Sequence, residues 1–179
     1  QAAVEALQAI SPDTPAQAME NGDAAAAGDI VVLTVPAAHQ ISTLDALKDH
    51  LKGKILIDVT VPLVPPKVGT VQMPEEGSAG KRAQDFLGEE VHVVSAFQNI
   101  AAHLLQQDVV IECDVLVAGN SKDSRAKVIE MITEAGMTGR HAGPLANAAA
   151  DGALTSILIQ INRGGLLSHS GIKIIGQEH

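Results

Sequence analysis

A cluster of polar and aromatic residues follows the apolar run VHVV at residues 91–94. Ser95, Gln98 and Asn99 lie within five positions of one another, together with Ala96 and Phe97. A buried parallel strand can be continuously apolar and has no structural need for this mixture. Ser95 and Asn99 can also be read as turn or helix-cap residues. We favour a ligand site, because such groups let a flat ring approach the backbone while fixing its edge atoms.

Two other apolar runs end in the same way. DIVVLTVP covers residues 29–36 and KILIDVTVP covers 54–62, and each stops at a proline. In open sheets of parallel strands, ligands bind outside the carboxyl ends of the strands. The three loops TVPAAH, VTVPLVPP and SAFQNIAAH are therefore expected to border one site. Each proline turn could equally be only a strand stop or a buried loop contact, and the residues alone leave this open.

Apolar strands alternate with amphipathic helices along the chain, which predicts an α/β fold with a doubly wound parallel sheet. A small helical C-terminal part is expected after a boundary near residues 143–144, where AGPLANA begins a last helix. The expected elements are strands over 29–36, 54–62, 91–97 and 114–119, and helices over 23–27, 37–51, 78–87, 100–107 and 120–135.

Composition restricts the class of protein. The 179 residues are 46% hydrophobic and 18% charged, which is typical of a folded domain with a sizeable core. The net charge of −9 argues against binding to nucleic acid. The single cysteine, Cys113, excludes an internal disulfide and a cysteine-based zinc site. With no apolar run near the roughly 20 residues that a membrane helix needs, we expect a cytoplasmic protein.

Six segments occur together in the order of a known family: DIVVLTVPAAH, KILIDVTVPLVP, GSAGKRAQDFLG, VVSAFQNIAAHLLQ, DVLVAGNS and AGPLANA. In these the chain resembles the NADPH-dependent coenzyme F-420 reductases, which are deazaflavin-linked NADP oxidoreductases. The resemblance implies a Rossmann-type NADP-binding domain over residues 1–142. It also implies that residues 143–179 complete the deazaflavin site. Such enzymes pass a hydride between NADP(H) and coenzyme F-420, and they usually work as homodimers.

The same resemblance implies the cofactor-binding residues. No catalytic side chain and no metal are expected, because in hydride transfer the cofactors supply the reacting atoms and the protein supplies distance and orientation. The implied residues are Thr34, Val35, Pro36, His39, Pro62, Leu63, Ser95, Ala96, Phe97, Gln98, Asn99, Gly143, Pro144, Leu145 and Asn147.

The chain departs from the family pattern in two places. No segment matches the glycine-rich G-x-G-x-x-G turn, and the nearest, GSAG at 77–80, follows a loop. We therefore expect an N-terminally incomplete sheet that lacks the family's first strand–helix–strand and its phosphate site. ANAAADGAL at 146–154 stands where many relatives have Ser and Arg. Two alternatives remain: a related NADPH-dependent flavin or ferric reductase domain, and a non-catalytic module for dimerisation or nucleotide sensing.

Overall fold

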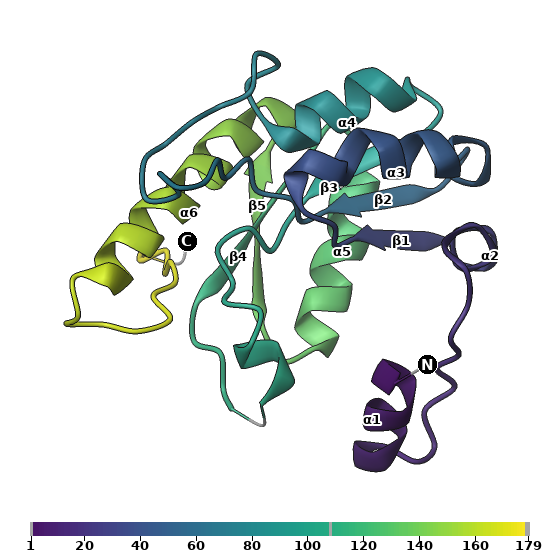
Figure 1. The fold of residues 1–179 in the computed structure, drawn as a ribbon, viewed down its shortest axis with the longest axis horizontal. Coiled ribbons are helices and arrows are strands. Elements are labelled where there is room, and N and C mark those ends of the chain that lie inside the picture. The colour runs from purple at the N-terminus through teal and green to yellow at the C-terminus, as the bar shows by residue number, and fades with distance from the viewer. Residues whose placement is uncertain (1, 108, 178–179) are drawn as a thin grey trace.

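The computed structural model describes residues 2–107 and 109–177, which form a mixed sheet and its flanking helices (Figure 1). The sequence analysis expected two parts, residues 1–142 and 143–179. Their outer limits, residues 1 and 179, lie outside the described residues. The described strands are β1 (Ile30–Leu33), β2 (Ile55–Asp58), β3 (His92–Ser95), β4 (Asp114–Gly119) and β5 (Thr138–Gly143). The described α-helices are α1 (Ala2–Ile10), α2 (Asn21–Ala27), α3 (Gln40–Leu47), α4 (Ala79–Leu87), α5 (Lys122–Glu134) and α6 (Ala148–Arg163).

The strands are ordered β1-β2-β3-β4-β5 across the sheet. β1, β2 and β3 are parallel, and their last residues Leu33, Asp58 and Ser95 are paired with one another in register. The predicted α/β class is confirmed, but the sheet is not wholly parallel: β4 runs antiparallel to β3 and parallel to β5.

The connection between β3 and β4 explains this reversal. A parallel strand needs a crossover, usually a helix, to return the chain to the starting edge of the sheet. The helix expected over 100–107 is only the 3₁₀ turn Leu104–Gln106. With no α-helix among the described residues of this connection, the chain turns back, and β4 pairs with β3 through Ala118 and Gly119.

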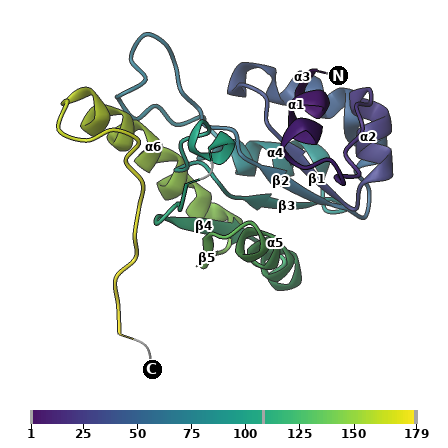
Figure 2. The same cartoon turned by 90° about the horizontal axis from the view of Figure 1, so that it is seen from below.

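Alternate strand residues face two hydrophobic clusters, one on each side of the sheet. Leu56 and Val93 lie in the first cluster, under α3 and α4. Ile57 and Val94 lie in the second, under α5. Figure 2 shows α3 and α4 on the opposite side of the sheet from α5. This two-sided cover accounts for the continuously apolar strands.

Local signals set the ends of α4. Ser78 caps its first turn, with its Oγ accepting a hydrogen bond from the Lys81 amide at 3.0 Å. Gly88 ends it at φ +79°, a conformation that favours glycine. Both boundaries agree with the sequence prediction. GSAG at 77–80 enters α4 from the long loop over 59–78, so in the described part of the chain it is not a strand–turn–helix phosphate motif.

No residue of α1 is buried. Among the described residues, no helix is long and apolar enough to cross a membrane.

Candidate functional site

The polar cluster after β3 forms a tight, strained turn. Phe97 has φ +72°, in the left-handed region that non-glycine residues rarely adopt, and its carbonyl accepts from the Ile100 amide at 3.1 Å. The Gln98 side chain folds back and donates to the Ser95 hydroxyl at 2.7 Å and to the Asp58 carbonyl at 2.8 Å. A left-handed phenylalanine costs about 1–2 kcal/mol, and such strain gathers at functional sites.

One atom of this turn lacks a partner. Gln98 is only 6% exposed, and its buried Oε1 accepts no hydrogen bond from any residue that the structure describes. The Asp58 carbonyl fixes the orientation of the amide, because a carbonyl only accepts and only the amide nitrogen can donate to it. A buried acceptor left unsatisfied costs about 1–3 kcal/mol. Gln98 Oε1 is therefore an unsatisfied acceptor held inside the turn, which is a second sign of strain there.

Asn99 connects the turn to α6. Its Nδ2 donates to the Asp151 carboxylate, and Thr155 Oγ1 donates to the Gln98 carbonyl at 2.9 Å and to Asn99 Oδ1 at 3.3 Å. Asp151 is 3% exposed, and burial raises the pKa of its carboxyl to about 7 while the Asn99 hydrogen bond partly opposes the shift. The carboxyl thus titrates near neutral pH beside the candidate site. The sequence analysis did not identify Asp151 or Thr155.

The segment at residues 143–147 lies level with the end of β3. Gly143 pairs with Ala118, which in turn pairs with Ser95. Leu145 is fully buried, and a Cβ on Gly80 would lie 3.3 Å from both Leu145 Cδ1 and Ser95 Cβ. The structure therefore brings Ser95 and Leu145 together across Gly80. Pro144 and Asn147 are exposed, and Asn147 Nδ2 donates to the Ala142 carbonyl at 2.5 Å.

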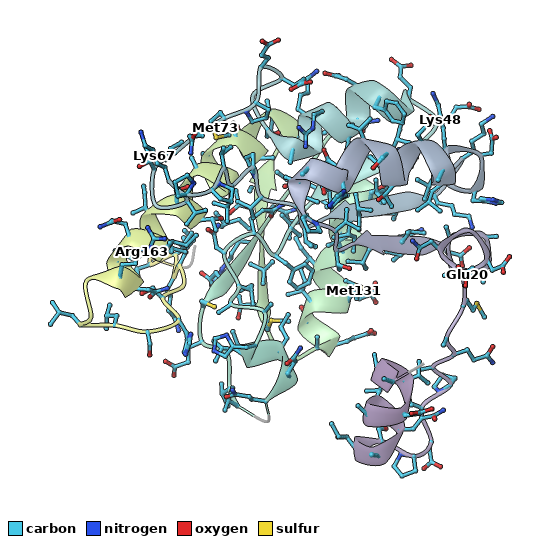
Figure 3. All side chains as sticks on the ribbon, in the orientation of Figure 1. Glu20, Lys48, Lys67, Met73, Met131 and Arg163 are labelled. Atoms are coloured by element: carbon cyan, nitrogen blue, oxygen red, sulfur yellow. The ribbon has the colours of Figure 1, made fainter. Side chains whose placement is uncertain are left out.

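The loops after β1 and β2 enclose a cavity of about 540 Å³. Residues 37–38, 62–65 and 72–74 form its mainly apolar wall, and Arg82 is its charged residue. Of the predicted site residues, Pro62 and Leu63 line it. Figure 3 shows Met73 on the loop of residues 59–78. This loop lies against α6, since a Cβ on Gly69 of the loop would be 3.3 Å from Nη1 of Arg163 in α6.

The remaining predicted residues occupy the rim. Thr34 and Val35 line a separate cavity of about 300 Å³ along β1, between α2 and α3. Pro36 and His39 are exposed and line neither cavity. The structure thus gathers the predicted residues at one end of β1–β3 but divides them between an apolar cavity, a buried turn and an exposed rim.

Two contacts join the turn to the apolar cavity. Gln98 donates to the carbonyl of Asp58, where the chain leaves β2 toward Pro62. A Cβ on Gly152 of α6 would lie 3.7 Å from Pro62 Cδ, so Pro62 sits next to the helix that holds Asn99. A ligand in the cavity would therefore lie against the same loop that the turn supports.

A buried network that sequence reasoning missed lies behind the cavity. Gln40 Nε2 donates to Asp58 Oδ2 at 2.9 Å, and Gln40 Oε1 accepts from Arg82 Nε at 2.7 Å. Burial raises the pKa of Asp58, while hydrogen bonds from Thr60 and Gln40 and the charge of Arg82 oppose the shift. The signal in the sequence was Asp58 itself, the single acid in the apolar run ILIDVTV.

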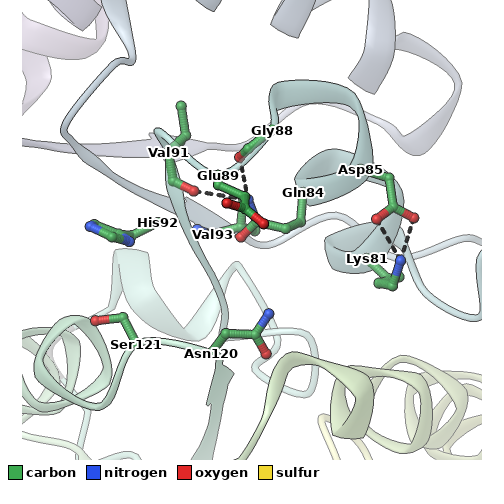
Figure 4. A pocket seen from close by; sticks show the side chains of 10 residues that line it. All are labelled: Lys81, Gln84, Asp85, Gly88, Glu89, Val91, His92, Val93, Asn120 and Ser121. Atoms are coloured by element: carbon green, nitrogen blue, oxygen red, sulfur yellow. Dashed lines mark hydrogen bonds and ion pairs between the residues drawn. The ribbon is translucent and has the colours of Figure 1, made fainter.

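A further cavity of about 570 Å³ lies at the other end of β3, beside its first residue His92 (Figure 4). Three of its polar side chains bind groups of the cavity wall: Lys81 pairs with Asp85, and Gln84 Nε2 donates to the carbonyls of Gly88 and Val91. None of the predicted site residues lines it.

Comparison with known proteins identifies the family. The family described as coenzyme F420-dependent NADP oxidoreductase matches residues 2–62. The F420-dependent NADP reductase of Methanocaldococcus jannaschii is 35% identical over 165 residues, which make up 89% of this chain and 74% of that protein. The chain belongs to the coenzyme F420-dependent NADP oxidoreductase family. The family resemblance read from the sequence motifs is confirmed.

Other members and structures agree. The F420-dependent NADP reductase of Methanothermobacter thermautotrophicus is 37% identical over 168 residues, covering 90% of this chain and 72% of that protein. The crystal structure of a protein from Arthrobacter sp. FB24 superposes on this chain with a TM-score of 0.76 at 24% identity. The match covers 88% of this chain and 74% of that protein's chain. The latter comparison establishes the shared Rossmann-type fold.

Proposed function

We propose that this protein is an oxidoreductase that transfers a hydride between NADP(H) and the deazaflavin coenzyme F-420. Family membership and the activity named for its relatives in two methanogens support this function. In the structure, the observation that carries it is the strained turn at Phe97, with the unsatisfied Gln98 Oε1, at the carboxyl edge of β1–β3. This is the edge at which open α/β sheets bind their ligands.

The residues present are suited to a planar ring system. Cofactor pockets are usually concave, mostly apolar and about 300–1,000 Å³ in volume, with a few placed polar groups. The cavity of about 540 Å³ has this character, since prolines, alanines and Leu63 supply most of its wall. The fit does not depend on any acid or base.

When bound, the two cofactors supply the hydride donor and the hydride acceptor themselves. The side chains of this protein would orient the rings and exclude water. Pro62 and Leu63 cover one side of the cavity. Phe97 packs against the hydrophobic cluster under α5 and so anchors the turn at the end of β3. Asn99, fixed by Asp151 and Thr155, keeps the turn in place. Hydride transfer needs the reacting atoms about 3–3.5 Å apart, so this rigidity is the main contribution of the protein.

The division of labour along the chain is part of the proposal. Residues up to 142 would bind NADP(H), and residues from 143 onward would complete the deazaflavin site. The hydrogen bonds from Asn99 and Thr155, which join α6 to the turn after β3, support this division. The cofactor-binding residues named from the resemblance, from Thr34 to Asn147, form the proposed site and its rim.

We also propose a cytoplasmic homodimer. Apolar side chains remain uncovered along α6 and just after it: Ile157 is 48% exposed, Ile161 43%, Leu166 94% and Leu167 60%. A strip of exposed apolar side chains is typical of a protein interface. Light scattering after size exclusion tests it, and Ile157→Lys with Ile161→Lys should give a monomer if this strip is the interface. The single cysteine is consistent with a reducing compartment.

A spectroscopic assay tests the activity. The full-length protein is mixed with reduced coenzyme F-420 and NADP, and the absorbance of the oxidised deazaflavin is followed in a stopped-flow instrument. The expected result is growth of that absorbance, which depends on both cofactors. No change would overturn the function and favour a non-catalytic nucleotide-sensing module. Reduction of a flavin or of ferric iron in place of the deazaflavin would favour the ferric reductase alternative.

Variants of the turn test the site. Phe97→Ala and Asn99→Ala should each lower kcat/KM by roughly tenfold or more, because each loosens a group that positions a ring. His92→Ala, at the opposite end of β3, is a matched control and should retain the kinetics of the unchanged protein. Unaltered kinetics in both turn variants would remove the site from this turn while leaving the activity itself intact.

A further inference from the structure

The apolar cavity between the loops after β1 and β2 contains one charged side chain. Arg82, in the second turn of α4, is half-buried and lines this cavity together with residues 62–65 and 72–74. Desolvating a charge is costly unless it is paired or hydrogen-bonded. The position of a guanidinium in a mainly apolar wall therefore requires an explanation.

The guanidinium of Arg82 is hydrogen-bonded but not ion-paired within the described residues. In that part of the chain, no carboxylate oxygen lies within 4.0 Å of it. Its Nε donates to Gln40 Oε1 at 2.7 Å and its Nη2 donates to the Ala37 carbonyl at 3.0 Å. Nη1 has no hydrogen-bond partner among the described residues. The neighbouring Lys81, by contrast, is paired with Asp85.

The guanidinium is held in place before any ligand arrives. Gln40 is fully buried, and its Nε2 contacts Asp58 Oδ2 at 2.9 Å, Thr60 Oγ1 at 3.0 Å and the Ala79 carbonyl at 3.0 Å. Because these partners are acceptors, the Gln40 oxygen must face Arg82. The carboxyl of Asp58 stands behind Gln40. A fixed guanidinium binds a planar or tetrahedral anion at a lower entropic cost than a mobile one.

Building on the proposed function, we propose that Arg82 is an anion-binding residue, which holds a phosphate or carboxylate group of one of the two cofactors at the apolar cavity. If Arg82 served only to hold Gln40 and the Ala37 carbonyl in place, it would need only Nε and Nη2, and a neutral donor could do the same. The free Nη1, and the lack of a carboxylate within 4.0 Å in the described part of the chain, point instead to an anionic ligand. The carboxyl of Asp58 acts on Arg82 only from behind Gln40. The protein carries a net charge of −9, so an anionic cofactor also needs a local positive group to offset the repulsion.

The source of the anion is either the deazaflavin tail or the nucleotide. Intact coenzyme F-420 carries a phosphate and carboxylates on its tail, whereas its deazaflavin head alone has neither. NADP(H) carries its own phosphates. Binding of each compound can therefore be measured separately by titration calorimetry, and the KM of each by the hydride-transfer assay.

Arg82→Gln is the principal variant. We expect the Kd and KM of one cofactor to rise by roughly 10- to 100-fold, since a hydrogen bond to a charged group contributes about 1.5–3 kcal/mol. The kcat should change less than threefold. Arg82→Lys keeps the charge but lacks the fork of donors. Its Kd and KM should therefore lie between those of the unchanged protein and those of Arg82→Gln. Lys81→Gln removes the same charge from the adjacent position of α4, outside the cavity, and should leave both cofactors unaffected.

Each outcome is decisive. A rise for intact coenzyme F-420 but not for its head group assigns the anion to the tail, and a rise for NADP(H) assigns it to the nucleotide. Unchanged Kd and KM for both cofactors, or a loss confined to kcat and thermal stability, would overturn the proposal and leave Arg82 as a brace. If Arg82→Gln does not fold, Arg82→Lys decides by the same criteria. A failure of the proposed function is distinct, because the unchanged protein would then transfer no hydride.

Discussion

The Asn99 carboxamide donates a hydrogen bond to the Asp151 carboxylate and so fixes the turn after β3 to α6. The carboxyl is 3% exposed, and its only identified stabilising partner among the described residues is this amide. Burial raises its pKa from 3.8 to about 7. The link therefore contains a group whose charge changes near neutral pH, which affects both stability and the geometry of the candidate site.

Asp151→Asn should stabilise the protein more at pH 8.5 than at pH 5. Between pH 4 and pH 7 the folded protein holds a proton on Asp151 that the unfolded chain releases, so stability from this group falls as pH rises through that window. Each unit of pKa shift corresponds to roughly 1.4 kcal/mol. Asparagine is neutral and can still accept from Asn99. Urea denaturation at the two pH values measures the difference.

The exposed Asp85→Asn is the control for this experiment. Asp85 pairs with Lys81 on the surface, and such pairs contribute about 0–1 kcal/mol. Its effect on the unfolding free energy should be small at both pH values. A gain from Asp151→Asn that is the same at pH 5 and pH 8.5 would contradict a buried ionising carboxyl at this position.

Phe97→Gly should unfold less easily than Phe97→Ala. Both variants lose the ring, but only glycine relieves the left-handed backbone at φ +72°, and the expected difference is about 1 kcal/mol. Both should lower kcat/KM, because loss of the ring removes its packing on the cluster under α5 and loosens the turn that carries Gln98 and Asn99. The measurements are denaturant unfolding and the hydride-transfer assay.

His169 provides a comparison for the backbone effect. It also has a left-handed backbone, with φ +59°, but lies on the C-terminal segment near His103. His169→Gly should likewise be more stable than His169→Ala. Equal stabilities for Phe97→Gly and Phe97→Ala would show that the turn is not strained.

The sequence predicted the parts of the fold that depend on local chemistry. Ser78 and Gly88 delimit α4 because a hydroxyl cap and a left-handed glycine act within one turn of the helix. The direction of β4 was not predictable in this way, because it depends on whether residues 96–113 form a crossover helix. Apolar periodicity in IAAHLLQQ is equally compatible with a 3₁₀ turn.

The site was predictable only in outline. Strand ends and the resemblance identified the turn at Ser95–Asn99, which the structure shows to be buried and strained. The network of Gln40, Asp58 and Arg82 joins residues far apart in the chain. Asp58 stands out as the single acid in an apolar run, but Gln40 and Arg82 look like ordinary polar residues in the sequence. Such pairing is determined by the packing of α3 and α4 on β2, so no local pattern reveals it.

Gly143→Ala should destabilise the protein and also disturb the candidate site. Gly143 has φ +89°, and a Cβ there would lie 2.9 Å from Asn147 Nδ2, which donates to the Ala142 carbonyl. Gly53 shares the left-handed backbone at φ +74°, but a Cβ at this position would have no described atom within 4 Å. Gly53→Ala should therefore cost about 1 kcal/mol of strain alone.

Hydride-transfer kinetics separate the two glycine variants. Gly143→Ala should raise a cofactor KM, because it displaces the segment from Pro144 to Asn147, whereas Gly53→Ala should leave KM unchanged. Identical kinetics for the two variants would exclude residues 143–147 from cofactor binding and would leave only the strain in common.

Gln40→Met should destabilise the protein by roughly 3 kcal/mol, because it leaves Asp58 and Arg82 without their shared partner in a buried setting. Methionine has a similar volume, so the change tests the hydrogen bonds more than the packing.

A double-mutant cycle of Gln40→Met with Asp58→Asn, measured by urea unfolding, isolates the coupling between Gln40 and Asp58. The cost of Gln40→Met should be smaller in the Asp58→Asn background, since a neutral amide is less costly to leave unpaired. Gln72→Met, which removes only hydrogen bonds to the Val64 and Lys67 carbonyls at the surface, should cost less than about 1 kcal/mol. Strict additivity in the cycle would mean that Gln40 does not connect the carboxyl to the guanidinium, and the preorganisation of Arg82 would lose its structural basis.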